Sequence, residues 1–263
     1  MDNVNVAYDD NVVYHFTSLK TAVKHILVDQ QLRLSPYIKT NDPKESKAPV
    51  IPWKPSKDFK GSLEKSKIVR SMIEIYTKVI CFSQDRLTSK GKIIKGYNLP
   101  TMWAHYADNH CGICLVFKKD ELIKNISKTV PSQNLVCAKV RYSNDLNRYL
   151  RNFRKFTLED FLYSTKEKVF NDYSGKIFKL IKSFFLQKRM DWSIECEYRF
   201  IINEFKEGYK YFNYGCSLAE IILGSHVNTN STLYREIIEY AKTNNLKISR
   251  IHWEFGMGDC IGV

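Results

Sequence analysis

Short apolar runs typical of β-strands are scattered between helical patterns, and no regular strand–helix–strand alternation connects them. The strand-like runs are residues 11–16, 78–83, 112–118, 218–224 and 247–255. The helical patterns are residues 18–30, 63–76, 99–109 and 232–245. Thr17 or Ser18 can cap the first of these helices. Doubly wound folds need regular alternation, so the sequence predicts an α+β fold with one domain over residues 1–263.

Two long segments interrupt this pattern. Residues 39–62 are rich in Pro, Lys and Ser and keep no apolar period, which predicts a long loop inserted into the domain. Residues from about 145 to 189 are polar and helix-prone, with interspersed aromatic residues. We expect them to form a helical insertion.

The stretch DWSIECEYRFIINEF, residues 191–205, combines a strand-like pattern with an unusual run of charges. With period two, one face is apolar and carries Ile194, Cys196, Tyr198 and Phe200. The other face carries Glu195, Glu197 and Arg199. Two carboxylates about 7 Å apart on one strand face let one act in chemistry while the other tunes it. The alternative is an edge strand with an exposed charged face, on which Arg199 pairs with Glu197.

Two aromatic motifs offer further candidate residues. His15 is followed at i+2 by Thr17, just before an expected helix start, an arrangement that suits a ribose or a phosphate. The alternative is a structural histidine. On the helix expected at 99–109, Trp103 is read as a core residue. Tyr106 either packs in the core or offers its ring to a flat heterocycle.

Charge and cysteine usage indicate partners and compartment. The net charge is +13, from 41 Lys plus Arg against 28 Asp plus Glu, and it favours an anionic partner such as nucleic acid, a nucleotide or an acidic protein. A lysine-rich proteome is the alternative explanation. Seven cysteines indicate free thiols in a reducing compartment. Cys111 and Cys114 have a spacing found in metal and redox sites, and the alternative is that they are two packed thiols.

The N-terminus and the hydropathy pattern suggest where the chain resides. The sequence MDNVNVAYDD is acidic and polar, unlike a signal peptide, and no apolar run approaches the roughly 18–20 residues that span a bilayer. We expect a cytoplasmic protein with no membrane partner.

Several short blocks, taken in chain order, resemble one family. The blocks are YHFTSL, NDPKES, CFSQD, MWAHYADNHCGICLVF, W-x-x-E-x-E-Y-R-F and EIILG. Together they resemble the bacterial DUF2971 family, which is similar to the ADP-ribosyltransferase fold. The matching regions are residues 13–45, 80–117 and 187–224.

This resemblance implies two small β-sheets packed across an NAD cleft, with surrounding helices, and NAD as a substrate without a metal. It implies a functional triad of His15, Tyr106 beneath the nicotinamide, and Glu197 as the catalytic carboxylate. Glu195 would be the catalytic helper. The resemblance also implies cofactor-binding roles for Thr17, Ser83 and Arg199.

The segment before the catalytic strand would shape the choice of acceptor. It offers Lys188, Arg189 and Trp192, and cations with a ring suit single-stranded nucleic acid, either RNA or DNA. A protein acceptor and plain NAD hydrolysis are alternatives, and a non-enzymatic nucleic-acid-binding module is another class. The resemblance suggests a toxin or phage-defence setting, in which an antitoxin protein would be a further partner.

Overall fold

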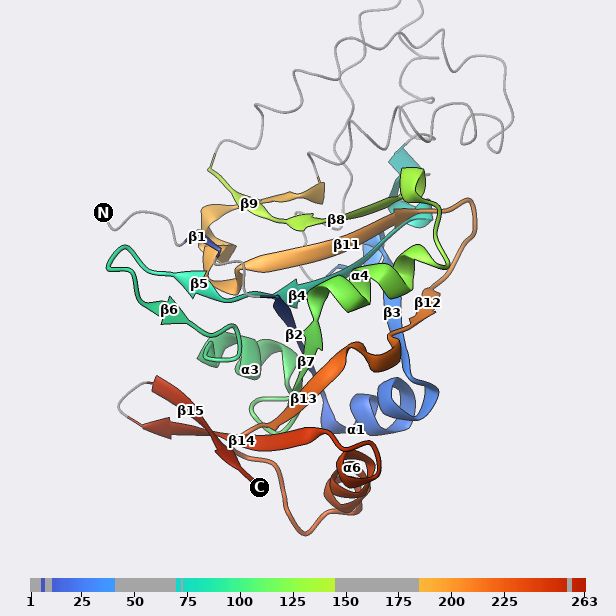
Figure 1. Cartoon of the computed structure of the whole chain (residues 1–263). Helices are drawn as coiled ribbons and strands as arrows, with labels where there is room; N and C mark the ends of the chain where they lie inside the picture. The colour runs from blue at the N-terminus through green and yellow to red at the C-terminus, as the bar shows by residue number, and fades with distance from the viewer. Residues whose placement is uncertain (1–5, 8–10, 41–69, 72, 145–184, 255–256) are drawn as a thin grey trace, which may run out of the picture.

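The computed structural model describes residues 6–7, 11–40, 70–71, 73–144, 185–254 and 257–263. The predicted loop at 39–62 and the helical insertion at about 145–189 lie mostly outside these residues (Figure 1). Of the helix predicted at 63–76, residues 70–71 and 73–76 are described, and they are helical.

Strands dominate the described part of the chain and are mostly short. They are β1 (Val6–Ala7), β2 (Val12–Thr17), β3 (Gln31–Pro36), β4 (Thr77–Ser83), β5 (Arg86–Leu87), β6 (Ile93–Ile94), β7 (Ile113–Lys118), β8 (Leu135–Lys139), β9 (Arg141–Tyr142), β10 (Gln187–Lys188), β11 (Glu197–Asn203), β12 (Lys210–Asn213), β13 (Leu218–Leu223), β14 (Lys247–Glu254) and β15 (Met257–Gly262). Ten of these strands form one hydrogen-bonded sheet; β1, β5 and β6 form a small second one, and β9 pairs in parallel with β10.

The large sheet branches at β4. One edge of β4 pairs with β11 along its whole length. On the other edge, β3 reaches β4 only through residues 35 and 36, and β2 reaches it only where Tyr14 lies opposite Ser83. The result is two arms, β12-β3-β4-β11-β8 and β2-β7-β13-β14-β15, joined at Tyr14–Ser83. The α+β class is confirmed, but the arms belong to one branched sheet rather than two separate sheets.

Helices flank the arms. They are α1 (Leu19–Thr21), continued by the π-helix η1 (Ala22–Leu27), α3 (Pro100–Tyr106), α4 (Lys119–Ser127) and α6 (Thr232–Thr243); short 3₁₀ turns are η2 (Tyr37–Lys39), η3 (Ser132–Asn134), η6 (Met190–Glu195) and η7 (Gly215–Ser217). Ser18, rather than Thr17, caps the first helix, because its hydroxyl accepts a hydrogen bond from the Thr21 amide at 3.0 Å. Within the described part of the chain, strands β8, β9 and β11 lie at one end, and β14, β15 and α6 lie at the other (Figure 1).

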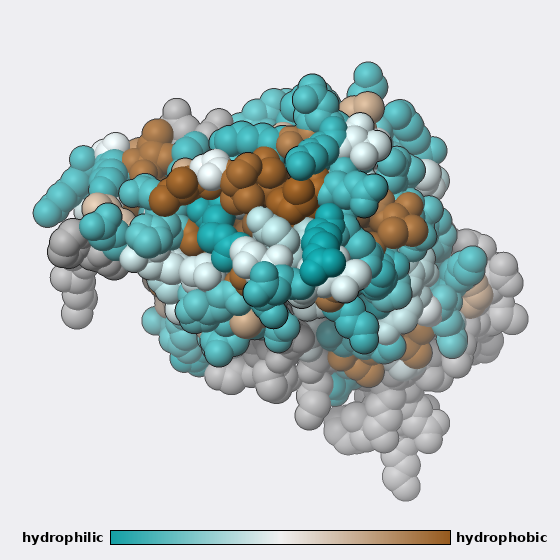
Figure 2. All heavy atoms as spheres, turned by 90° about the horizontal axis from the view of Figure 1, so that it is seen from below, coloured by the Kyte–Doolittle hydropathy of each residue, from teal (hydrophilic) through white to brown (hydrophobic). Residues whose placement is uncertain are grey.

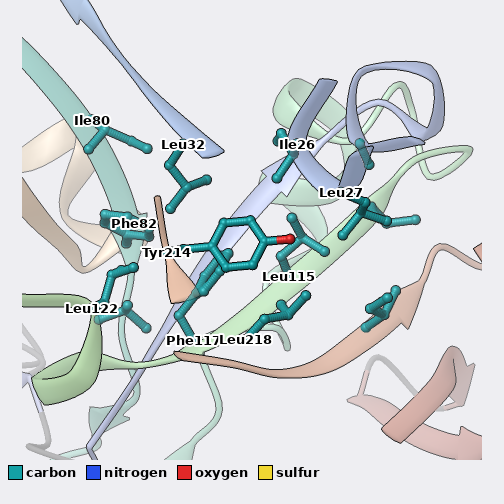
Figure 3. Close-up of a cluster of buried hydrophobic side chains, with 14 of the residues drawn as sticks. Ile26, Leu27, Leu32, Ile80, Phe82, Leu115, Phe117, Leu122, Tyr214 and Leu218 are labelled. Atoms are coloured by element: carbon teal, nitrogen blue, oxygen red, sulfur yellow. The ribbon is translucent and has the colours of Figure 1, made fainter. Parts of the chain in front are cut away.

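A large apolar core fixes the junction of the arms. Side chains from η1, β3, β4, β7 and α4 converge around Tyr214, as Figure 3 shows. Phe82 of β4 packs on Phe200 of β11 with ring centroids 5.1 Å apart. A second cluster surrounds Trp103, which is fully buried and edge-on to Phe16 at 5.2 Å, so its core role is confirmed.

The strand predicted at 191–205 begins later than the pattern suggested. Residues Met190–Glu195 form the turn η6, Cys196 adopts a left-handed conformation with φ 46°, and β11 starts at Glu197. The prediction that Glu195 and Glu197 share one strand face is therefore wrong, because Cys196 turns the chain between them. An exposed edge strand is also ruled out, since β11 pairs with β4 and β8 and all seven of its residues are buried. The pairing of Arg199 with Glu197 that this alternative included is confirmed.

The surface mixes apolar and polar side chains. On the face seen in Figure 2, brown hydrophobic side chains gather among teal hydrophilic ones, so the high net charge does not make this face uniformly hydrophilic. Within the described residues, no helix is both long and apolar enough to cross a membrane.

Candidate functional site

A cavity of about 550 Å³ opens where β2 and β3 diverge on the same edge of β4. Its walls come from β2, β3, β4, η1 and α3, with Lys188 of β10, Glu197 of β11 and Tyr211 of β12. A cavity of this size is within the range that holds small-molecule ligands. The branching of the sheet therefore creates the site.

Glu197 is a buried carboxylate at the cavity wall. Arg199 donates to its Oε2 through Nε at 2.8 Å and through a second guanidinium nitrogen, and Lys188 Nζ lies 3.5 Å from its Oε1. Burial opposes ionisation, but the charges of Arg199 and Lys188 overcome it and lower the pKa of Glu197. The side chain is thus a fixed anion.

Glu195 lies beside this pair but faces different partners. Lys188 Nζ is 2.6 Å from its Oε2, and the Tyr106 hydroxyl donates to its Oε1 at 3.0 Å. Burial and the neighbouring Glu197 charge raise the pKa of Glu195 to about 7, and Lys188 only partly offsets them. Burial and the Glu195 charge also raise the pKa of Tyr106. The two carboxylates therefore differ in proton affinity near neutral pH.

Three polar side chains of the central strands line the same cavity. His15 Nδ1 lies 3.2 Å from the Cys81 carbonyl, so a proton on Nδ1 would leave Nε2 as an acceptor. Burial lowers the pKa of His15, with a further contribution from Arg33. Thr17 contributes a hydroxyl. Ser83 Oγ is fully buried and has no hydrogen-bond partner among the described residues.

Ser83 and Glu197 are held side by side by the strand register. They lie directly opposite each other in the antiparallel pairing of β4 with β11. Opposite residues in such a pair project to the same face. A hydroxyl with no partner among the described residues therefore lies next to the fixed carboxylate.

The structure brings most of the predicted site residues together. Those that line the cavity are His15, Thr17, Ser83, Tyr106, Lys188 and Glu197. Glu195 and Arg199 are buried behind them and contact them directly. Arg189 instead pairs with Asp191 at 3.1 Å, and neither it nor Trp192 lines the cavity. Lys188 is only 4 % exposed and contacts the carboxylates and the Trp192 ring, so its charge does not face solvent.

Sequence reasoning missed several supporting groups. The Glu197 amide donates to the Tyr142 hydroxyl at 2.8 Å, and Arg199 Nη1 donates to the Phe185 carbonyl at 2.8 Å. Neither contact has a local sequence signal. Arg33 also lines the cavity, and its place between Leu32 and Leu34 in an alternating strand could have marked it as facing away from the core.

All seven cysteines are free thiols. Cys114 is buried in β7, whereas Cys111 is exposed, so the expectation of two packed thiols holds for only one of them. Among the described side chains, no group of three or more His, Cys, Asp and Glu residues is placed to hold a metal ion.

The fold and site define an α+β protein with a polar cavity at the branch of its sheet and a buried, ion-paired carboxylate in the wall. A family model described as a protein of unknown function, DUF2971, matches residues 102–200. This segment contains Tyr106, Lys188, Glu195 and Glu197 and excludes His15. The match supports the resemblance to DUF2971 over that part of the chain. No curated protein and no solved structure matches the chain.

Proposed function

We propose that the chain is an NAD-dependent ADP-ribosyltransferase that modifies nucleic acid. The observation that carries the proposal is the Glu197 carboxylate, held as an anion by Arg199 and Lys188 in the wall of a cavity of about 550 Å³. A fixed anion of this kind suits a reaction that develops positive charge on a sugar.

The chemistry assigns one task to each residue. NAD supplies a positively charged nicotinamide leaving group, which departs as neutral nicotinamide with the electron pair of its bond to ribose. A nucleophilic atom of the acceptor forms the new bond to the ribose carbon and releases its proton. Glu197 stabilises the positive charge that develops on the ribose ring and can accept a hydrogen bond from a ribose hydroxyl. The unpartnered Ser83 hydroxyl, opposite Glu197 in the strand pairing, offers a second contact to the same sugar.

His15 and Tyr106 would hold the substrate. His15 can offer Nε2 to a hydroxyl because Nδ1 faces the Cys81 carbonyl. Tyr106 lines the cavity with its hydroxyl tied to Glu195, so its ring orientation is fixed for stacking on nicotinamide. Glu195 acts through Tyr106 and Lys188, and we assign it a positioning role and the capacity to accept a proton near neutral pH.

The acceptor assignment rests on charge. The chain carries +13, and Arg189 and Trp192 precede the strand that holds Glu197. Cations contact phosphates and rings stack on bases, which favours RNA or single-stranded DNA. A toxin or phage-defence role, with an antitoxin partner, is the setting that the family resemblance suggests.

Labelled NAD tests both the reaction and the acceptor. The protein is incubated with NAD labelled in the adenosine half and with RNA, single-stranded DNA and cell protein in parallel. We expect the label to appear on nucleic acid and to be removed by nuclease. The Glu197→Gln variant should fail to transfer the label. Label that persists on polypeptide after nuclease treatment would replace the nucleic-acid acceptor with a protein. Nicotinamide release without labelling would indicate NAD hydrolysis, and the absence of both would leave a non-enzymatic binding module.

A further inference from the structure

The end of the cavity lined by β3 and β12 carries two cations that pair with no carboxylate of the described residues. Arg33 and Lys39 both line the cavity, and neither forms an ion pair with any described residue. Asp29 is the only acidic residue of the described lining at this end, and no ion pair joins it to either cation. This end of the site therefore keeps a net positive charge.

An aromatic ring holds the two cations instead. Arg33 Cζ and Lys39 Nζ each lie 4.5 Å from the centroid of the Tyr209 ring, and Lys39 Nζ donates to the Tyr209 hydroxyl at 2.7 Å. A carboxylate partner would cancel the charge, whereas a ring positions a cation and leaves its charge available. We call Arg33, Lys39 and Tyr209 the cation clamp.

Strand β3 presents Arg33 of the clamp to the cavity together with further hydrogen-bonding groups. Alternation along β3 places Gln31, Arg33 and Ser35 on one side, and all three line the cavity. Tyr211 of β12 lies opposite Arg33 in the antiparallel pairing and is 50 % exposed. A ligand at this end thus meets two cations, an amide, a hydroxyl and an exposed ring.

The two ends of the cavity differ in how their charges are compensated. Arg199 and Lys188 neutralise Glu197 at one end, whereas at the other the clamp cations have no carboxylate partner among the described residues, and this difference would orient an asymmetric ligand. At one end, Glu197 is an anion beside the Ser83 hydroxyl, suited to a sugar. At the other end, the clamp suits an anion with two or more oxygens. The charge of Arg33 also lowers the pKa of His15, behind the larger effect of burial, so its field reaches the middle of the site.

The size of the site favours a small nucleotide over a polynucleotide at this end. Nucleic-acid binding depends on many cations that track a backbone across an open surface. Here the two cations of the clamp lie at one end of a cavity of about 550 Å³. We propose that the cation clamp binds the diphosphate of a nucleotide and thereby turns the ribose of NAD toward Glu197. The second part of this inference rests on the proposed function, and the first does not.

Calorimetry with ADP tests the clamp without requiring any reaction. The double variant Arg33→Gln/Lys39→Gln is compared with the wild type and with Lys24→Gln/Lys247→Gln, which removes two exposed cations outside the cavity. We expect ADP affinity to fall at least about 10-fold in the clamp variant only, corresponding to about 1.4 kcal/mol. Adenosine, which lacks phosphate, should bind equally to all three proteins.

Unchanged ADP affinity in the folded clamp variant, or an equal loss in the control variant, would overturn the proposal. So would a clamp variant that loses affinity for a short single-stranded RNA but keeps its affinity for ADP. The outcome is independent of the proposed function. If ADP binding depends on the clamp and the wild type does not cleave NAD, the clamp stands and the transferase fails. If NAD is cleaved and ADP affinity is unchanged, the transferase stands and the clamp fails.

Discussion

At the scale of single residues, the pKa values of Glu195 and Glu197 are shifted in opposite directions because the two side chains have different partners. Arg199 and Lys188 hold Glu197 as an anion, whereas burial and the Glu197 charge favour the protonated form of Glu195. Lys188 contacts both, at 2.6 Å from Glu195 and 3.5 Å from Glu197. The pair can therefore hold one fixed charge and one exchangeable proton in a small volume.

This difference predicts an unusual dependence of stability on pH. The pKa of Glu195 is raised from 4.5 to about 7 by folding, so its protonated form is the one that folding favours. Its stabilising contribution is complete below about pH 4.5 and is lost as the pH rises toward about 7. Relative to Glu195→Gln, the wild type should lose up to a few kcal/mol of unfolding free energy across that window, measured by urea titration. A constant difference between the two proteins would contradict the assignment.

The ring and the hydroxyl of Tyr106 can be separated by substitution. Tyr106→Phe keeps the ring and removes the hydrogen bond to Glu195, whereas Tyr106→Ala removes both. If the ring stacks on nicotinamide, calorimetry should show NAD affinity nearly unchanged in Tyr106→Phe and about 10-fold weaker in Tyr106→Ala. Equal affinities in the two variants would show that the ring does not contact NAD.

At the scale of elements, the turn before β11 decides where the carboxylates lie. Cys196 has φ 46° and ψ 53°, a left-handed conformation that is costly for most residues and worst for β-branched ones. Its carbonyl accepts a hydrogen bond from the Gln84 amide at 3.0 Å, which ties the turn to the end of β4. This turn lets Glu195 face Tyr106 while Glu197 faces the cavity.

A β-branched residue should disrupt this turn. Cys196→Val is expected to destabilise the protein by about 1–3 kcal/mol, because valine cannot adopt the left-handed conformation without strain. Cys137→Val is the matched control, since Cys137 lies in β8, where β-branched residues are favoured. Thermal unfolding of the two variants gives the comparison, and equal melting temperatures would contradict the strain.

The limits of sequence reasoning are also visible at this scale. The apolar runs identified β2, β4, β7, β13 and β14, because each is buried along most of its length or alternates clearly. The pattern failed at residues 191–196, where alternating residues form a turn. The cavity could not be derived from spacing, because it depends on the register that places Ser83 opposite both Tyr14 and Glu197. Residue patterns singled out Glu195, Glu197, His15 and Tyr106 as candidates, and the family resemblance supplied their roles. Arg33 was missed because its place in the cavity depends on the divergence of β2 and β3.

At the scale of the whole molecule, the proposed reaction needs two binding sites, one for the nucleic-acid acceptor and one for NAD. In the proposed reaction, transfer to nucleic acid would use cations over the surface, whereas NAD would bind in the cavity. Transfer to RNA should therefore weaken steeply as salt rises, and NAD hydrolysis without acceptor should change far less. Rates of label transfer and of nicotinamide release, measured across one salt series, provide the test. Parallel loss of both rates would argue against a nucleic-acid acceptor.

Arg189 and Trp192, the residues expected to contact the acceptor, should affect transfer to nucleic acid but not NAD binding. Arg189→Ala/Trp192→Ala removes a cation and a ring that do not line the cavity. Transfer to nucleic acid should fall severalfold, while NAD affinity by calorimetry stays unchanged. A loss of NAD affinity with normal transfer at saturating NAD would show that these residues bind NAD rather than the acceptor.

The central claim is that Glu197 carries out chemistry on NAD, and nicotinamide release tests it most directly. Removing the charge takes away the carboxylate partner of the buried Arg199, so Glu197→Gln is measured beside Glu197→Asp, which keeps the charge, with unfolding curves for both. Glu236→Gln, which breaks an exposed pair with Lys24, is the control. We predict release by the wild type and the control, and a loss of about 100-fold or more in folded Glu197→Gln. Near-normal release by that variant, or no release by the wild type with RNA present, would contradict the account.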